Sequence, residues 1–128
     1  MLNYKKIISR LLDQNIYILS NDDKEAIIID PGLGFDLIDG YLKSENLSPI
    51  AVLATHAHID HIASANDCIK NYNIPFYICR GNSIMLDHYD IMKGYMHVDS
   101  EKPQVSHWIE ETDKKLTVGS FEFNVNYN

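Results

Sequence analysis

Four side chains that can bind a metal ion stand within six residues of one another. They are His56, His58, Asp60 and His61, in the stretch Thr55-His56-Ala57-His58-Ile59-Asp60-His61. Imidazole together with carboxylate favours zinc, iron or manganese over calcium or magnesium. Because no cysteine lies in the cluster, we expect an open site that holds water and not a closed structural zinc site. The residue types and their spacing therefore predict a catalytic metal centre.

The spacing also suggests how the four side chains are shared between two metal ions. His56 and His58 are two residues apart, so in extended backbone their rings point to the same side and can reach one metal. Asp60 and His61 follow where the chain turns into a helix, and they suit a second metal. Two metals sharing a water molecule lower the pKa of that water toward neutrality. We expect Asp60 to be catalytic, as a ligand that also orients the water, in the hydrolysis of an ester, thioester, amide or phosphoester.

The alternative is a polar surface loop that binds nothing. A lone histidine is usually of that kind, and for His88, His97 and His107 we expect ordinary surface or packing roles. For the cluster itself, four possible ligands directly after an apolar run favour a metal site over a polar surface loop.

The elements around the cluster predict how it is held. Ile50–Thr55 has the apolar composition of a buried strand, and Glu25–Asp30 is a second such strand, with the helix Phe35–Ser44 between them. This order predicts a βαβ crossover with the histidines at the carboxyl end of a strand, where open α/β sheets usually place their sites. A helix over Ile62–Tyr72 should follow, and Asp60 could instead cap its N-terminus.

Asp30 ends its strand at the turn Asp30-Pro31-Gly32, and two roles are open for it. It could cap or close the turn, or it could approach the metal loop and orient a ligand. Gly32 and Gly34 do not complete a dinucleotide-binding fingerprint, because position 37 is leucine.

The remaining elements complete a mixed sheet. In the helix that starts at Asn82 we expect the stripe Ile84, Met85, His88 and Ile91 to face the core or to form a lid over substrate. The other expected elements are strands over Tyr4–Ser9, Asn15–Ser20, Pro75–Cys79 and Val105–Ile109, a helix over Asn82–Tyr89 or a little beyond, a loop over Lys93–Gln104, and a hairpin of Leu116–Val118 with Phe121–Val125 across Gly119-Ser120.

Composition limits the classes of protein that fit. The 128 residues make one domain, 45% of them are apolar, and the formal net charge is −7, which argues against a nucleic-acid partner. Cys68 and Cys79 lack metal-motif spacing and should be free thiols. Without a signal-peptide core or an apolar run of membrane-spanning length, we expect no membrane association and a cytoplasmic location.

The motif His56-x-His58-x-Asp60-His61 resembles the signature of the metallo-β-lactamase superfamily, and the order of elements around it matches over roughly Tyr4 to Val125. The nearest likeness is to glyoxalase II-like hydroxyacylglutathione hydrolases. The resemblance implies an αββα sandwich of two similar halves with two zinc sites, iron or manganese being alternatives. It also implies that His56 and His58 bind the first metal and that Asp60 and His61 bind the second.

The sequence departs from the family pattern in two places. Many glyoxalase II-like members have glycines after the motif, where Ile62, Ala63 and Ser64 stand here. The family's third histidine follows the strand that Phe121–Val125 resembles, in a Thr-Pro-Gly-His turn, where this sequence has Asn126-Tyr127-Asn128. The resemblance therefore implies an incomplete domain over residues 1–128. This would be the N-terminal half of the sandwich, an α/β unit with a mixed sheet and helices on one face, lacking the second half and its ligands.

These expectations give one main function and two alternatives. The main one is hydrolysis of a small-molecule thioester of the S-hydroxyacylglutathione class, weak or absent in the chain alone. A homodimer or a chain carrying the missing half would then complete the site. The alternatives are a non-enzymatic interaction module and an iron enzyme resembling the persulfide dioxygenases of the same superfamily. The charge disfavours an RNase Z-type nuclease.

Overall fold

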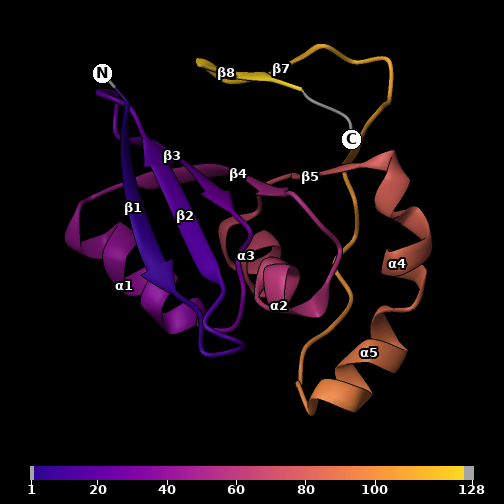
Figure 1. Ribbon diagram of the computed structural model, residues 1–128. Helices are drawn as coiled ribbons and strands as arrows, with labels where there is room; N and C mark the ends of the chain where they lie inside the picture. The colour runs from indigo at the N-terminus through magenta and orange to yellow at the C-terminus, as the bar shows by residue number, and fades with distance from the viewer. Residues whose placement is uncertain (1, 126–128) are drawn as a thin grey trace.

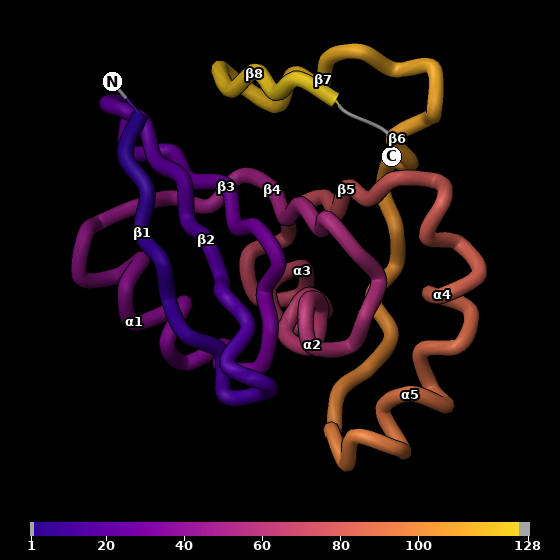
Figure 2. The backbone as a smooth tube through the Cα atoms, viewed as in Figure 1, coloured from indigo at the N-terminus to yellow at the C-terminus, as the bar shows by residue number. Residues whose placement is uncertain are grey.

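The chain folds into a six-stranded mixed sheet with helices on one face and a β-hairpin on the other (Figure 1, Figure 2). The computed structural model describes residues 2–125. The strand order in the sheet is β1-β2-β3-β4-β5-β6, and the hairpin β7-β8 is a separate two-stranded sheet. This confirms the predicted α/β class with a mixed sheet and helices on one face.

The first three strands form an antiparallel meander. β1 (Asn3–Ile8) pairs antiparallel with β2 (Asn15–Ser20), and β2 pairs antiparallel with β3 (Glu25–Ile29). Asn21 shapes the second turn, because its Oδ1 accepts hydrogen bonds from the backbone N–H groups of Asp23 and Glu25. The meander thus leads from the exposed edge of the sheet to its buried centre.

The other strands run parallel to β3. Helix α1 (Phe35–Ser44) connects β3 to β4 (Ser48–Ala54), which confirms the βαβ crossover. β5 (Phe76–Cys79) pairs parallel with β4, and β6 (His107–Ile109) pairs parallel with β5. Because parallel strands end at the same edge of a sheet, the segments that follow β3, β4 and β5 lie side by side.

The segment after the histidines is two helices and not the single helix predicted over Ile62–Tyr72. α2 (Ile59–Ile62) begins inside the motif, and α3 is Ala65–Tyr72. Ser64 separates them because its backbone N–H donates to the carbonyl of Pro31, and its Oγ accepts from the N–H of Gly34. The turn after β3 therefore holds this junction. Asp60 lies in the first turn of α2, so its predicted alternative as an N-cap is wrong.

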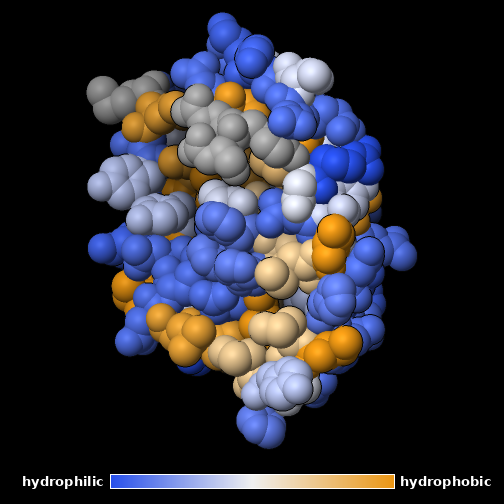
Figure 3. Space-filling view, turned by 45° about the vertical axis from the view of Figure 1, so that its right-hand side comes forward, coloured by the Kyte–Doolittle hydropathy of each residue, from blue (hydrophilic) through white to orange (hydrophobic). Residues whose placement is uncertain are grey.

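The chain between β5 and β6 is more helical than the sequence predicts. A 3₁₀ turn, η1 (Arg80–Asn82), leads into α4 (Ser83–Asp87), and α5 spans Tyr89–Met96. Of the stripe expected to face the core, Met85 packs against it, whereas His88 is exposed, Ile84 is 71% exposed and Ile91 is 59% exposed. Leu86 and Tyr89 fill the core-facing positions instead. Figure 3 shows apolar side chains on the face where these helices lie.

Each face of the sheet has its own apolar core. Ile28, Val52 and Ile78 point toward the helices. Ile27 and Ala51 point the other way, where the hairpin of β7 (Lys115–Val118) and β8 (Phe121–Asn124) covers them. The hairpin buries Leu116, Val118 and Phe121 against this second face.

Two further expectations concern thiols and membranes. Cys68 and Cys79 are free thiols, the first buried and the second half-buried. Burial raises the pKa of both thiols, which favours their neutral form. Within residues 2–125, every helix is too short or too polar to cross a bilayer.

Candidate metal centre

The histidine loop connects the carboxyl end of β4 to α2, at the edge where the parallel strands end. Along it, exposed and buried residues alternate: His56 and His58 are exposed, whereas Ala57 is 2% exposed and Ile59 is 3% exposed. The two buried side chains belong to the core under the helices. This alternation is typical of extended backbone, in which side chains two residues apart point to the same side, so both imidazoles lie together as their spacing predicts.

The three histidine rings lie close together. The rings of His56 and His58 are stacked, with centroids 5.7 Å apart and planes 15° apart. The ring of His61 lies 5.2 Å from that of His56 and 6.1 Å from that of His58. The loop and the first turn of α2 thus bring all three imidazoles to one place.

A carboxylate completes the group. Ligand atoms of His58, Asp60 and His61 all lie within 4.8 Å of one another, and His61 Nε2 is 3.8 Å from Asp60 Oδ2. Two nitrogen donors and one oxygen donor at this separation can share one ion. The division expected from the sequence, His56 with His58 at one metal and Asp60 with His61 at another, remains a prediction.

The carboxylate of Asp30 contacts both Thr55 and His61. This side chain is buried, and Oδ2 lies 3.1 Å from His61 Nδ1. The same carboxylate accepts the backbone N–H of Thr55 at 2.7 Å and its hydroxyl at 2.6 Å. Of the two roles that the sequence left open, the structure shows the contact with the metal loop. A carboxylate on Nδ1 fixes the tautomer of His61 and leaves Nε2 for a ligand.

The turn after Asp30 packs directly against the loop. Asp30 itself has φ +52°, a left-handed conformation in which Asp and Asn are enriched. A Cβ built on Gly32 would lie 2.7 Å from the backbone oxygen of Asp60 and 2.6 Å from Gln14 Oε1. Only glycine leaves room for this approach, so Gly32 determines how close the turn and the ligand loop lie.

Sequence reasoning missed Asn82. Its Oδ1 accepts the backbone N–H of Ala57 at 3.1 Å, between the two exposed histidines. Nothing in its local sequence indicates this contact, because it joins loops that follow two neighbouring strands. The only usable signal is the strand order, which places the segment after β5 beside the segment after β4.

The comparison with known families identifies the fold. Residues 9–124 match the family described as the metallo-beta-lactamase superfamily. The chain belongs to this superfamily. It matches "Probable metallo-hydrolase YqgX" of Bacillus subtilis (strain 168) with 39% identity over 67 residues, which are 52% of this chain and 31% of the relative. The "Hydroxyacylglutathione hydrolase" of Buchnera aphidicola subsp. Schizaphis graminum (strain Sg) is 43% identical over 65 residues, 51% of this chain and 26% of that one.

A solved structure agrees with the superfamily assignment. The BLEG-1 B3 metallo-beta-lactamase superposes with a TM-score of 0.82 and 34% identity, covering 95% of this chain and 59% of that one. The chain thus corresponds to part of a larger metallo-beta-lactamase fold, and it spans a third or less of the first two curated relatives.

The donor set fits the ions that the metallo-beta-lactamase superfamily binds, which are usually zinc. His58, Asp60 and His61 offer borderline-soft nitrogen and hard oxygen at one point, and Asp30 holds one of the rings. Thr55 Oγ1 lies 3.1 Å from His56 Nδ1, so the Nε2 of His56 is the nitrogen left for an ion.

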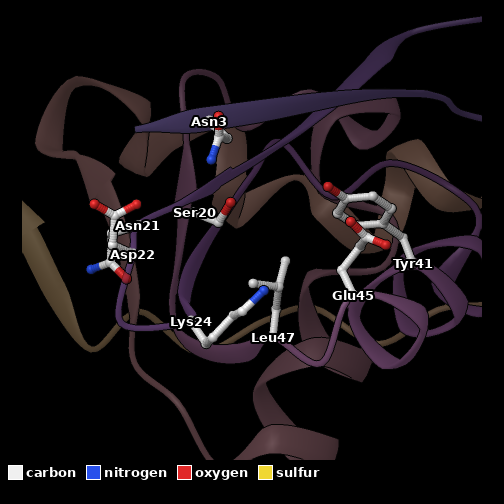
Figure 4. A pocket seen from close by; sticks show the side chains of 8 residues that line it. All are labelled: Asn3, Ser20, Asn21, Asp22, Lys24, Tyr41, Glu45 and Leu47. Carbon is white, nitrogen blue, oxygen red and sulfur yellow. The ribbon is translucent and has the colours of Figure 1, made fainter. Parts of the chain in front are cut away.

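Two hollows lie at opposite edges of the sheet. One of about 280 Å³ lies beneath the hairpin and includes Thr55, so it adjoins the histidine loop; the half-buried Cys79 also lines it. The other, of about 230 Å³, lies at the opposite edge of the sheet, before β3 and β4 begin (Figure 4). The first is mainly apolar and is the one close enough to matter for chemistry at the loop. The residues that line the second are Asn3, Ser20, Asn21, Asp22, Lys24, Tyr41, Glu45 and Leu47.

Proposed function

We propose that this chain hydrolyses thioesters of the S-hydroxyacylglutathione class, with zinc held by His56, His58, Asp60 and His61. The observation that carries the proposal is that ligand atoms of His58, Asp60 and His61 lie within 4.8 Å of one another, with the His61 ring in contact with the buried Asp30. A histidine ring whose second nitrogen contacts a carboxylate is typical of metal centres.

Each side chain has a proposed part. Asp30 contacts Nδ1 of His61 and Thr55 contacts Nδ1 of His56, which would leave the Nε2 of each ring to hold an ion. Asp60, in the first turn of α2, would be a further ligand and would orient the attacking water. A divalent ion at this point supplies Lewis-acid activation of water and of the substrate carbonyl.

The thioester class is supported by the Buchnera relative, whose matched 65 residues are 43% identical. The strength of catalysis is a separate matter. Catalytic zinc usually has three protein ligands, and if two ions bind with the division predicted from the sequence, the four side chains supply only two ligands for each. We therefore expect weak metal binding and slow turnover in the 128-residue chain.

The test combines metal content with activity. The purified chain is dialysed against zinc, iron or manganese, its metal content is measured, and hydrolysis of an S-hydroxyacylglutathione is followed. We expect zinc to be retained best, with turnover that depends on it. His58→Ala should lose both, whereas His88→Ala, which removes an exposed histidine outside the cluster, should lose neither. Equal metal retention in wild type and His58→Ala would refute the proposal.

A second candidate function is a partner-binding module, favoured by exposed apolar side chains. Ile84, Ile91 and Tyr95 on α4 and α5 are 59–79% exposed, and Tyr4 on the edge strand β1 is 71% exposed. Such residues suit a homodimer or a chain carrying further ligands. Sedimentation velocity distinguishes the candidates: a monomer at all concentrations would count against the module.

A further inference from the structure

Asn82 stands outside the proposed ligand set but touches the backbone that carries it. It is the last residue of η1, directly after β5, and β5 is the parallel neighbour of β4. Ala54 of β4 pairs with Ile78 of β5, so the segments that follow them leave the sheet side by side (Figure 1). This arrangement brings a residue 25 positions away in sequence to the middle of the histidine loop.

The contact is a single hydrogen bond at a sensitive point. Asn82 Oδ1 accepts the backbone N–H of Ala57 at 3.1 Å, and Nδ2 donates to the carbonyl of Cys79 at 3.4 Å. The second bond fixes which end of the amide faces the loop. Ala57 lies between His56 and His58, so this bond holds the stretch of backbone that carries both rings.

The side chain is not engaged in the role that its position suggests. Asn82 occupies the N-cap of α4, and asparagine is among the residues preferred there because its side chain can accept from the first turn. α4 has no side-chain cap hydrogen bond. The amide is therefore directed to the histidine loop instead of to its own helix.

We infer that Asn82 is a positioning residue, which holds His56 and His58 in register for a divalent metal ion by anchoring Ala57. The residues from Thr55 to His58 form no helix or strand, so the loop has no ladder of its own to keep the rings stacked. Ligands must be held to within about 0.5 Å for productive geometry, and loss of supporting contacts typically weakens metal binding by about 10–100-fold.

The test uses the full chain with Asn82→Leu, which removes both hydrogen bonds at similar volume, and Asn82→Asp, which keeps an acceptor for Ala57. Asn71→Leu is the matched control, since Asn71 is exposed and its amide donates to the carbonyl of Asp67 within the same helix. Three quantities are measured at two salt concentrations: hydrogen exchange of the Ala57 amide, the NOE between the His56 and His58 rings in metal-free protein, and zinc affinity by chelator competition.

In Asn82→Leu we expect faster exchange at Ala57, loss of the NOE and about 10–100-fold weaker zinc binding. Asn82→Asp should restore exchange protection and the NOE, at both salt concentrations, and Asn71→Leu should resemble wild type. Unchanged Ala57 exchange or an unchanged NOE in Asn82→Leu would overturn the inference. So would equal losses in Asn71→Leu, or zinc affinity that stays at the wild-type value while the NOE is lost.

The affinity measurement rests on the proposed metal site, whereas the exchange and NOE measurements do not. Wild-type protein that binds no zinc would therefore refute the proposed function, and the two metal-free readouts would still decide whether Asn82 sets the positions of the two rings.

Discussion

At the scale of single residues, the histidine cluster is supported by side chains that lie outside it, and Asp30 is the main example. Asp30 accepts three hydrogen bonds from the ligand loop and the helix after it, two from Thr55 and one from His61. It does so from a left-handed backbone conformation that few residues adopt. A single buried carboxylate thus joins the end of β3 to the start and the end of the metal-binding motif.

Asp30→Asn tests this support without disturbing the backbone, because asparagine tolerates the same conformation. The amide keeps one acceptor but places a donor near the His61 ring, so His61 is no longer fixed. We expect zinc affinity to fall by about 10–100-fold. Asp36→Asn, at an exposed carboxylate paired with Arg10, serves as the control and should leave affinity unchanged. Equal affinity in wild type and Asp30→Asn would show that Asp30 has no such role.

Some of these residue contacts could be predicted from the sequence and others could not. That His56 and His58 face the same side followed from their spacing, since successive side chains in extended backbone point to opposite sides. The partner of Asp30 stayed open, because a strand-end aspartate suits a turn as well as a metal site. The contact of Asn82 with Ala57 could not be predicted, because it depends on which strands are neighbours in the sheet.

At the scale of elements, the turn after β3 and the ligand loop after β4 are packed as one unit. Ser64 binds Pro31 and Gly34, and Gly32 lies against the carbonyl of Asp60. The sequence predicted one helix over Ile62–Tyr72 and left Ile59–His61 in the loop, whereas the structure has α2 over Ile59–Ile62 and a break before α3. Helical spacing of apolar residues continues through Ser64, and only the tertiary contact with the turn interrupts it.

Gly32→Ala tests this packing. The added methyl group would meet the Asp60 carbonyl and the side chains of Gln14 and Ser9, all at 2.6–2.7 Å. Overpacking of this kind costs about 1–3 kcal/mol, so Tm should fall by about 4–12 °C. Because the turn would be pushed away from the loop, metal affinity should fall as well.

Gly40→Ala is the matched control. Gly40 lies within α1, and a Cβ there would meet nothing within 4 Å. Alanine in a helix interior is favoured over glycine by about 0.5–1 kcal/mol, so Tm should rise by a few degrees. A Gly32→Ala variant as stable as Gly40→Ala would contradict the packing described here.

At the scale of the whole molecule, the two faces of the sheet are covered unequally. Helices cover one face, and the hairpin β7-β8 covers the other over the parallel strands. The sequence predicted helices on one face of the sheet and the hairpin as an element, but of the stripe on α4 and α5 only Met85 packs against the core. Helical spacing shows that Ile84 and Ile91 share a side but not whether that side meets the core, and both are exposed.

The hairpin should depend on its packing, because two strands alone are marginally stable in water. Phe121 is 2% exposed and belongs to the core beneath it. Phe121→Ala removes about 3–5 kcal/mol of packing, so amides in β7 and β8 should exchange faster while those in β3 and β4 keep their protection. Tyr95→Ala, at a side chain 79% exposed, should change neither. Uniform loss of protection across both sheets would show that the hairpin and the sheet unfold together.

The central claim is that His58, Asp60 and His61, with His56 beside them, hold a metal ion in this chain. A zinc titration of the metal-free protein, followed through the imidazole nitrogen resonances, tests it most directly. We expect the Nε2 resonances of His58 and His61 to shift together and to saturate at a fixed ratio of zinc to protein, while those of His88, His97 and His107 stay in place. Resonances of the cluster that do not move, or that move no more than those of the three isolated histidines, would contradict the account.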